Sequence, residues 1–412
     1  MVSPLLVVDE DMPYYIRSKN NDRILLILAA LFVMATYFLA TIGSGMYVLF
    51  AIVILFLVLS NYKFEVHAFH LLVFQFCLYC YANSMWAINY HNALANGNTI
   101  FELLICLSIM YCHFKKFNDV TQLMKLIMWV GYVVVFYCYL FYGVERVTDL
   151  ASEEGRLSNS FNNINTLSML ASTVVIINVF FILFRKRRSW FDLLILPTLF
   201  FVLSSQSRKG VGMIILGVFL LFLMKYLRSK ENNLLPLMRF VGFVLLFFII
   251  ILLFSSTSVM EGVTNRMMGF LAQYIDEGEI DASTQARIEL RHLGWEQFHK
   301  TPWFGIGMGC SYFLTHEEFG TNTYLHDNYV ELAACGGIFA LVSYYFIFLY
   351  LLFKERKYFK VDDMCNLILV LLIVKFFTDY GAVSYITKMN YFYLMVYFLH
   401  LESCKVKYPW IK

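Results

Sequence analysis

Residues 43–60 read GSGMYVLFAIVILFLVLS, a stretch without a single charged side chain. As an α-helix it would be about 27 Å long, close to the roughly 30 Å thickness of the hydrocarbon core of a membrane. A membrane-spanning strand would instead alternate polar and apolar residues, and this stretch does not. The sequence here predicts a transmembrane helix.

The same composition extends along the whole chain. Of its 412 residues, 60% are hydrophobic, 18% are aromatic and only 15% are charged, which lies far outside the range of water-soluble domains. We therefore predict an all-α polytopic membrane protein that forms a single transmembrane domain over residues 1–412. We expect about twelve spans, near residues 23–40, 43–60, 66–86, 99–114, 121–142, 162–184, 189–205, 210–227, 239–257, 328–353, 364–383 and 388–402.

Twelve crossings would place both termini on the same side of the membrane. If that side is the cytoplasm, the basic clusters at residues 115–116, 185–188 and 354–360 all fall inside, as the positive-inside rule requires. We therefore predict a multi-pass protein with cytoplasmic termini and a long extracytoplasmic loop at residues 258–327.

This loop is expected to carry short helices. Residues 283–300 read as one such helix, with Ser283 as its N-cap and Pro302 after its end. Three glycines follow at every second position: Gly305, Gly307 and Gly309. They do not form a dinucleotide-binding motif, because they follow a helix rather than a strand. We expect them to let the chain turn tightly across the mouth of the bundle.

Arg287 and Arg291 lie four residues apart on the predicted loop helix, so both side chains point the same way. Two planar guanidinium groups in this arrangement suit a phosphate or diphosphate. A pairing with Glu289, Asp281 or lipid headgroups is an equally good interpretation.

His326, Asp327 and Asn328 stand where the loop enters the next apolar run. A neutral imidazole can accept a proton from a hydroxyl group near pH 7, and an adjacent Asp or Asn can orient it. A lone histidine at a membrane interface can equally be a polar anchor. Asp327 can itself be the base, or simply the N-cap of the following helix.

Two further polar positions lie beside apolar runs. Arg208 and Lys209 occupy a short break between two runs, where an ionisable side chain usually faces a cavity or a partner. Asn162 and Asn165 lie three residues apart at the start of another run. Their amides can hydrogen-bond sugar hydroxyl groups or cap the helix.

Other unusual residues favour structural roles. Lys375 and Asp379 are four apart within one span, and we expect them to neutralise each other there. Cys77 and Cys80 have no second cysteine pair or histidine cluster to accompany them, so we expect neither a metal site nor a cofactor. Nothing in the sequence indicates nucleic-acid binding.

The order of these motifs resembles the bacterial O-antigen polymerase and O-antigen ligase superfamily, which includes Wzy-type polysaccharide polymerases. The resemblance rests on Arg287, on PWFGIG at residues 302–307, on HDNYVEL at residues 326–332 and on the glycines at 336–337. Two weaker matches lie upstream, RLS at residues 156–158 and SRKG at residues 207–210. The chain departs from the family pattern at Ser160 and Ile164, where Gly and Pro are frequent.

The resemblance implies a GT-C-like bundle in the bacterial cytoplasmic membrane. It also implies glycosyl transfer at the outer face, from a polyprenyl-diphosphate-linked glycan such as an undecaprenyl diphosphate to an acceptor hydroxyl group, without metal. Arg287 and Arg208 would bind the donor diphosphate, and His326 would be the base. The residues expected to contact substrate besides these are Arg291, Arg156, Asn165, Lys209, Asp327 and Asn328.

Polymerisation of lipid-linked repeat units into O-antigen, capsule or exopolysaccharide is our first hypothesis. A ligase that moves a finished glycan to a lipid, protein or cell-wall acceptor shares the same donor chemistry. A lipid-linked oligosaccharide flippase is a third hypothesis, although the two halves of the chain show no convincing repeat. A flippase and a chain-length regulator are expected partners of a polymerase.

Overall fold

The computed structural model describes residues 12–39, 45–60, 63–148, 162–184, 189–228 and 282–411, together with positions 238, 241, 242 and 245. Every regular element in these residues is helical, which confirms the predicted all-α class. The α-helices are α1 (Met12–Phe38), α2 (Gly45–Leu59), α3 (Ala68–Asn83), α4 (Tyr90–Phe114), α5 (Thr121–Tyr142), α6 (Val144–Thr148), α7 (Ile164–Phe184), α8 (Ile195–Ser204), α9 (Arg208–Arg228), α12 (Ala282–Lys300), α13 (Ser311–Phe319), α14 (Asn328–Glu355), α15 (Asp363–Asp379) and α16 (Lys388–Lys407).

Six helical segments in the described residues are long and apolar enough to cross a membrane: Asn21–Phe38, Tyr90–Phe117, Thr121–Tyr142, Ile164–Phe184, Arg208–Arg228 and Asn328–Tyr358. The apolar segments Gly45–Leu59 and Trp190–Ser204 are shorter. These helices confirm a polytopic membrane protein. The predicted span at 239–257 lies almost wholly outside the described residues, so the number of twelve stays a prediction.

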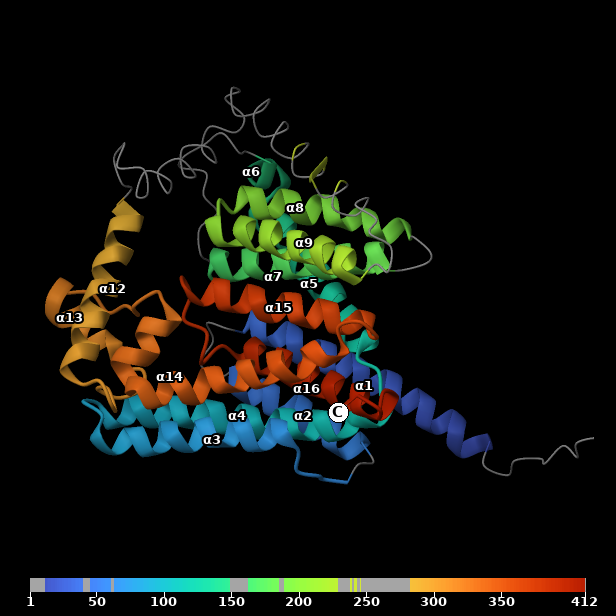
Figure 1. Ribbon diagram of the computed structural model, residues 1–412, viewed down its shortest axis with the longest axis horizontal. Coiled ribbons are helices and arrows are strands. Elements are labelled where there is room, and N and C mark those ends of the chain that lie inside the picture. Colours follow the sequence, from blue (N-terminus) through green and yellow to red (C-terminus); the bar gives the residue numbers. More distant parts are fainter. Residues whose placement is uncertain are drawn as a thin grey trace, which may run out of the picture.

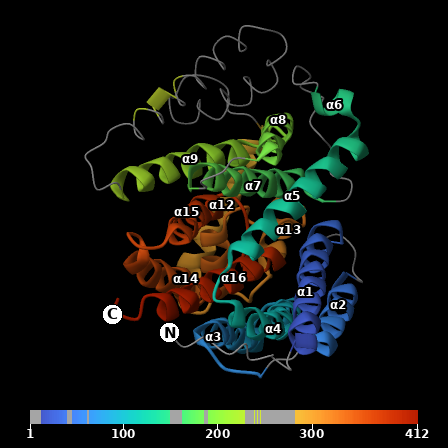
Figure 2. The ribbon, with the colours of Figure 1, turned by 90° about the vertical axis from the view of Figure 1, so that its right-hand side faces the viewer.

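The helices lie side by side in layers (Figure 1). α3 and α4 form one side, α14 and α16 pack next to them, and α15 lies between this group and the pair α7 and α9. The view turned by 90° shows α1 and α2 beside α4, with α5 leading from them toward α7 (Figure 2). One hydrophobic core joins these layers, so helices from both halves of the chain can share a site.

The directions of the helices show which residues lie at each end of the bundle. At one end Arg228 pairs with Asp363, so α9 finishes where α15 begins. The other end carries α12 and α13 (Figure 1) and includes His326, and we name it the His326 end. The basic clusters at residues 115–116 and 354–360 follow the final turns of α4 and α14, at the opposite end.

Helix α4 begins at Tyr90, well before the predicted start at residue 99. Asn89 caps it by accepting a hydrogen bond from the backbone N–H of Asn92 (3.0 Å). Asn96 is buried and donates to the carbonyl of Met308 (3.2 Å). The predicted start was wrong because a local cap at Asn89 begins the helix earlier and because a distant segment of the chain satisfies the buried amide of Asn96.

The predicted loop helix at residues 283–300 is confirmed as α12. It begins at Ala282, one residue before the expected N-cap Ser283. A second short helix, α13, follows in the same segment. Residues 258–281 lie outside the described residues, so the full extent of the predicted loop stays a prediction.

Helix α14 is interrupted at Gly337 (φ 66°, ψ −169°). An interrupted helix leaves backbone groups without intrahelical partners, and inside a membrane protein these have to be satisfied. Residues 302–308 run along the interruption and supply partners. Three backbone hydrogen bonds join the two segments: Ile306 N to Ala334 O (3.2 Å), Gly307 N to Cys335 O (2.8 Å) and Ile338 N to Pro302 O (2.9 Å). The segment between α12 and α13 is thereby fixed to α14.

Glycines permit this close approach. Gly305, Gly307 and Gly309 have φ values of 64°, 115° and 74°, in the region that favours glycine. A Cβ atom on Gly305 would lie 2.3 Å from the backbone carbonyl carbon of Cys335. The expectation that these glycines let the loop turn tightly at the end of the bundle is confirmed.

We expect Gly305→Ala to destabilise the protein more than Gly320→Ala. Both glycines have positive φ, but a Cβ on Gly320 would meet nothing within 4 Å. Gly320→Ala is expected to lose about 1–2 kcal/mol from backbone strain alone. Gly305→Ala is expected to lose about 1–3 kcal/mol more from the clash with α14. Thermal denaturation of the purified protein in detergent measures the difference, and equal losses would contradict the packing described here.

Candidate functional site

A cavity of about 380 Å³ lies at the His326 end of the bundle. Its walls come mainly from α1, α7, α9, α15 and α16 and from the turn at residues 382–387. The polar side chains in the wall include Asn162, Asn163, Asn165, Thr166, Thr173, Lys209, Lys375, Asp379, Ser384, Lys388 and Asn390, and the tyrosines are Tyr37, Tyr324, Tyr393 and Tyr397. Amide and hydroxyl groups can hydrogen-bond a polar ligand, and aromatic rings offer it flat apolar surface.

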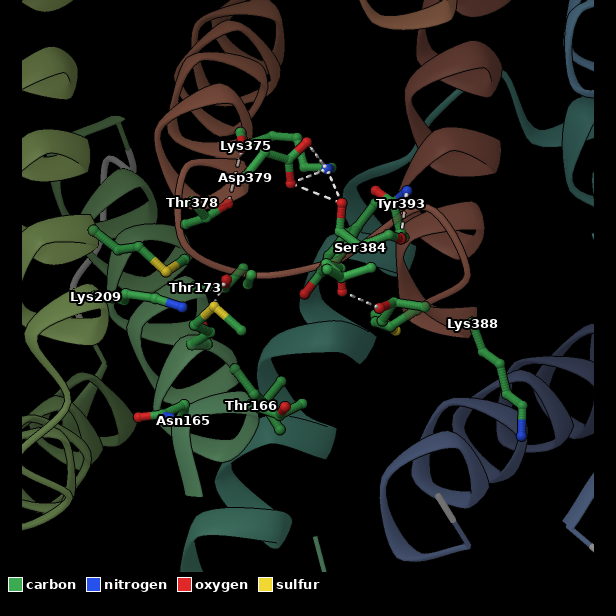
Figure 3. Close-up of a pocket in the computed structure, with 18 of the residues that line it drawn as sticks. Asn165, Thr166, Thr173, Lys209, Lys375, Thr378, Asp379, Ser384, Lys388 and Tyr393 are labelled. Atoms are coloured by element: carbon green, nitrogen blue, oxygen red, sulfur yellow. Dashed lines mark hydrogen bonds and ion pairs between the residues drawn. The ribbon is translucent and has the colours of Figure 1, made fainter. Parts of the chain in front are cut away.

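Three of the predicted site residues line this cavity: His326, Asn165 and Lys209. Figure 3 shows Lys209 reaching inward from the first turn of α9 and Asn165 on the first turn of α7. Arg156 lies outside the described residues. The structure therefore brings together residues that are more than 150 positions apart in the chain.

His326 lies between α13 and α14 with a left-handed backbone (φ 57°). Its ring lies beside that of Tyr324, with 4.2 Å between the ring centroids. Burial, and then the positive charges of Arg287 and Lys209, lower the pKa of His326 to about 4. The imidazole is therefore neutral near pH 7 and has a nitrogen that can accept a proton.

Arg208 and Arg287 lie on two helices that meet beside His326. The Arg208 guanidinium donates to the hydroxyl group of Thr284 in the first turn of α12 (2.6 Å). Arg287 follows three residues later on the same helix, and its charge acts on His326. The N-terminal parts of α9 and α12 thus gather the positive charges of Arg208, Lys209 and Arg287 next to the cavity.

Arg291 packs on the end of α15, with its guanidinium carbon 4.8 Å from the centroid of the Tyr380 ring. Its charge acts on Asp327, as that of Arg287 acts on His326. Both arginines therefore face the same short stretch, as their spacing predicted. Glu289 accepts a hydrogen bond from Gln285 (2.7 Å).

Asp327 is the N-cap of α14. Its carboxylate accepts hydrogen bonds from the backbone N–H groups of Tyr329 (2.9 Å) and Val330 (3.2 Å). Burial raises the pKa of Asp327 to about 6, although these two hydrogen bonds and the charge of Arg291 act against the rise. The sequence left two roles open for Asp327, a base or the N-cap of the following helix. Its hydrogen bonds are those of an N-cap.

Asn328 is fully buried and forms an internal cross-link. Its side-chain oxygen accepts hydrogen bonds from the backbone N–H groups of Ser384 (2.8 Å) and Tyr385 (3.0 Å). Its amide nitrogen donates to the Tyr345 hydroxyl group (2.9 Å). Asn328 therefore ties the start of α14 to the turn before α16, and it does not form part of the cavity wall.

The predicted pairing of Lys375 with Asp379 is confirmed. The amino group of Lys375 contacts both carboxylate oxygens of Asp379 and the hydroxyl group of Ser384 (2.6 Å). Figure 3 shows the three side chains meeting at the cavity wall.

Sequence reasoning missed Glu331, which is buried on α14 one turn after Asp327. Its carboxylate accepts hydrogen bonds from the hydroxyl group of Ser311 (2.6 Å) and the backbone N–H of Leu325 (2.9 Å). It thereby holds the start of α13 and the residue before His326. The signal that could have identified it is an acidic residue within an apolar run.

Among the described residues, Glu355, His400 and Cys404 lie close enough together to be considered as a metal site. However, the imidazole Nδ1 faces Glu355 (3.0 Å) and Nε2 faces Asp362 (3.2 Å). Both nitrogens are thus engaged by carboxylates. The cluster joins the ends of α14, α15 and α16 at the end of the bundle opposite His326.

Residues 193–345 match the family model described as O-antigen ligase, Wzy_C. The match covers less than half of the chain, but it contains Arg208, Lys209, Arg287, Arg291 and His326. It confirms the resemblance to the O-antigen polymerase and ligase superfamily. No curated protein matches the chain significantly.

Two N-cap aspartates allow a matched test of the electrostatics. Burial raises the pKa of Asp327 from 3.8 to about 6, so the ionised carboxylate is less stable in the folded protein than in the unfolded chain. Stability is therefore lost as the pH rises between about 4 and 6. Asp327→Asn keeps the cap without the charge, so we expect it to be more stable than wild type at pH 7, by on the order of 1–3 kcal/mol.

Asp362 is the control with the opposite sign. Burial acts to raise its pKa, but the hydrogen bond and charge of His400 outweigh this and hold the pKa at about 2. Its carboxylate stabilises the fold above pH 3.8, and that contribution is lost as the pH falls toward 2. Asp362→Asn should therefore lower the melting temperature at pH 7. The same sign of change in both variants would contradict these environments.

Proposed function

Because residues 193–345 match the O-antigen ligase family, we propose that the protein is a membrane glycosyltransferase that polymerises polyprenyl-diphosphate-linked oligosaccharide repeat units. The reaction would occur at the outer face of the bacterial cytoplasmic membrane. The observation that carries the proposal is the meeting of a neutral histidine with Arg208, Lys209 and Arg287 beside a polar cavity.

The donor needs little activation, because a diphosphate is already a good leaving group. In the proposed reaction an acceptor hydroxyl oxygen attacks the anomeric carbon, and the bond from that carbon to the diphosphate oxygen breaks. The electron pair leaves with the diphosphate, whose charge Arg208 and Arg287 would neutralise, with Arg291 and Lys209 assisting. Fixed positive charges at the place where negative charge develops lower the barrier, and no metal ion is required for this role.

His326 would accept the proton of the attacking hydroxyl group. Its low pKa in the free protein arises from burial and from Arg287 and Lys209. A bound diphosphate would offset these two positive charges and make the imidazole a stronger base when the donor is present. Asn165 would hydrogen-bond sugar hydroxyl groups in the cavity wall, and Arg156 would complete the cavity.

A ligase is the second candidate, and the description of the matched family favours it. A ligase would use the same donor site and would differ in the acceptor, which is a lipid, protein or cell-wall group instead of another repeat unit. A polymerase would in addition require a flippase to deliver the repeat units and would work beside a chain-length regulator.

Deletion of the gene in its host, followed by gel analysis of surface and lipid-linked glycans, tests the proposal. We expect single repeat units attached to their final carrier, because polymerisation fails while ligation continues. Long chains that accumulate on the lipid carrier would instead establish a ligase. Repeat units retained on the inner leaflet would establish a flippase.

The deletion strain also tests the assigned residues. We expect His326→Ala and Arg287→Ala to leave long-chain glycan absent while the protein remains in the membrane at its normal level. His316→Ala and Lys300→Ala are the controls, because these residues are exposed on α13 and α12, and both should restore the polymer. Normal polymer from His326→Ala and Arg287→Ala would refute the site.

A further inference from the structure

The Lys375–Asp379 pair has no part in the proposed reaction, yet it lies at the cavity wall. Exposed fractions of 15% for the Lys375 side chain and 1% for that of Asp379 leave both charges largely out of water, where a charge persists only if it is paired. The three N–H donors of Lys375 point to two carboxylate oxygens and to Ser384. No donor remains for a substrate, so the pair acts on its neighbours.

Two chains of hydrogen bonds connect the ion pair to Asn328, one through Tyr345 and one through Ser384. Asp379 accepts hydrogen bonds from the hydroxyl groups of Tyr345 (2.9 Å) and Ser384 (2.7 Å) and lies 3.4 Å from the Asn328 amide nitrogen. Tyr345 in turn accepts from the same amide nitrogen (2.9 Å), and the backbone of Ser384 donates to the Asn328 oxygen (2.8 Å). The pair therefore fixes both ends of the Asn328 side-chain amide.

His326 needs such support. Its backbone φ of 57° is one that residues with a side chain rarely adopt, and it persists only where the surroundings hold it. Glu331 holds the preceding residue by accepting from Leu325 N (2.9 Å). On the other side the fixed point is Asn328, two residues after the histidine.

We propose that the Lys375–Asp379 pair is a positioning element for His326, which holds the Asn328 amide and thereby keeps the histidine in its left-handed conformation facing the cavity. The inference rests on the proposed role of His326 as the base. The buried ion pair would then orient a catalytic residue in addition to stabilising the packing of α14 and α15.

The test compares Asn328→Ala, the charge-free double variant Lys375→Met/Asp379→Asn, and their combination. The double variant keeps the side-chain shapes and leaves no charge unpaired, so it is expected to fold. The matched control is Glu355→Gln/Asp362→Asn/His400→Gln, which removes the buried charges that join α14, α15 and α16 at the opposite end of the bundle and leaves none of the three without its partner. Each purified protein is assayed for transfer from a lipid-linked repeat unit.

We expect Asn328→Ala to lower turnover on the order of 100-fold and the double variant to lower it about tenfold, with KM for the donor within about twofold of wild type. The combination should be no slower than Asn328→Ala, because the ion pair acts on His326 only through the Asn328 amide. The control should keep normal turnover. Additive losses, or a change confined to KM, would overturn the proposal.

A second readout needs no activity. The rate at which diethylpyrocarbonate modifies His326, measured by mass spectrometry of its peptide, reports how firmly the ring is held against its surroundings. Asn328→Ala and the double variant should raise this rate several-fold over wild type, while the control should not. Unchanged modification overturns the positioning role even if the protein polymerises. Faster modification supports that role even if wild type fails to polymerise, which would refute only the proposed function.

Discussion

The backbone hydrogen bonds between residues 302–308 and the interrupted helix α14 are the constraint on which the site depends. The interruption at Gly337 exposes carbonyl groups that an apolar environment cannot satisfy. Ile306 and Gly307 satisfy two of them, and the hydroxyl group of Tyr79 donates to that of Gly336. The chain on either side of this contact forms α12 and α13, so the contact sets where Arg287 stands relative to His326.

The site gathers positive charge around a wall that carries little negative charge. Arg208, Lys209 and Arg287 converge, while Asp379 is neutralised by Lys375. Like charges held together away from water repel each other, and an anionic ligand relieves this repulsion. Such an arrangement would favour an anionic ligand such as the proposed diphosphate, and it keeps His326 unprotonated in the free protein. In the proposed reaction the negative charge of the bound donor would offset these positive charges. This would make His326 a stronger base for the acceptor hydroxyl group.

The length of the apolar runs and the residues expected at helix ends were enough to predict most of the long helices. The span at residues 121–142 coincides with α5, and the loop helix at 283–300 with α12. The start of α4 could not be predicted, because part of what satisfies the buried Asn96 amide is the carbonyl of Met308, far away in the chain. In the site, the i, i+4 spacing predicted the Lys375–Asp379 pair. Its connection to Asn328 depends on how three helices pack, which no local pattern encodes.

The pH dependence of transfer by the purified protein tests the central claim, a histidine base whose pKa is lowered by burial and by the cations of the proposed donor site. The profile of kcat/KM reports the free protein, and that of kcat reports the donor complex. We predict that kcat/KM falls as the pH drops through about 4, where burial and the charges of Arg287 and Lys209 place His326. The fall in kcat should occur at a higher pH, because the bound diphosphate offsets those charges. Acid limbs that coincide, or that persist unchanged at residual activity in His326→Ala, would contradict the account.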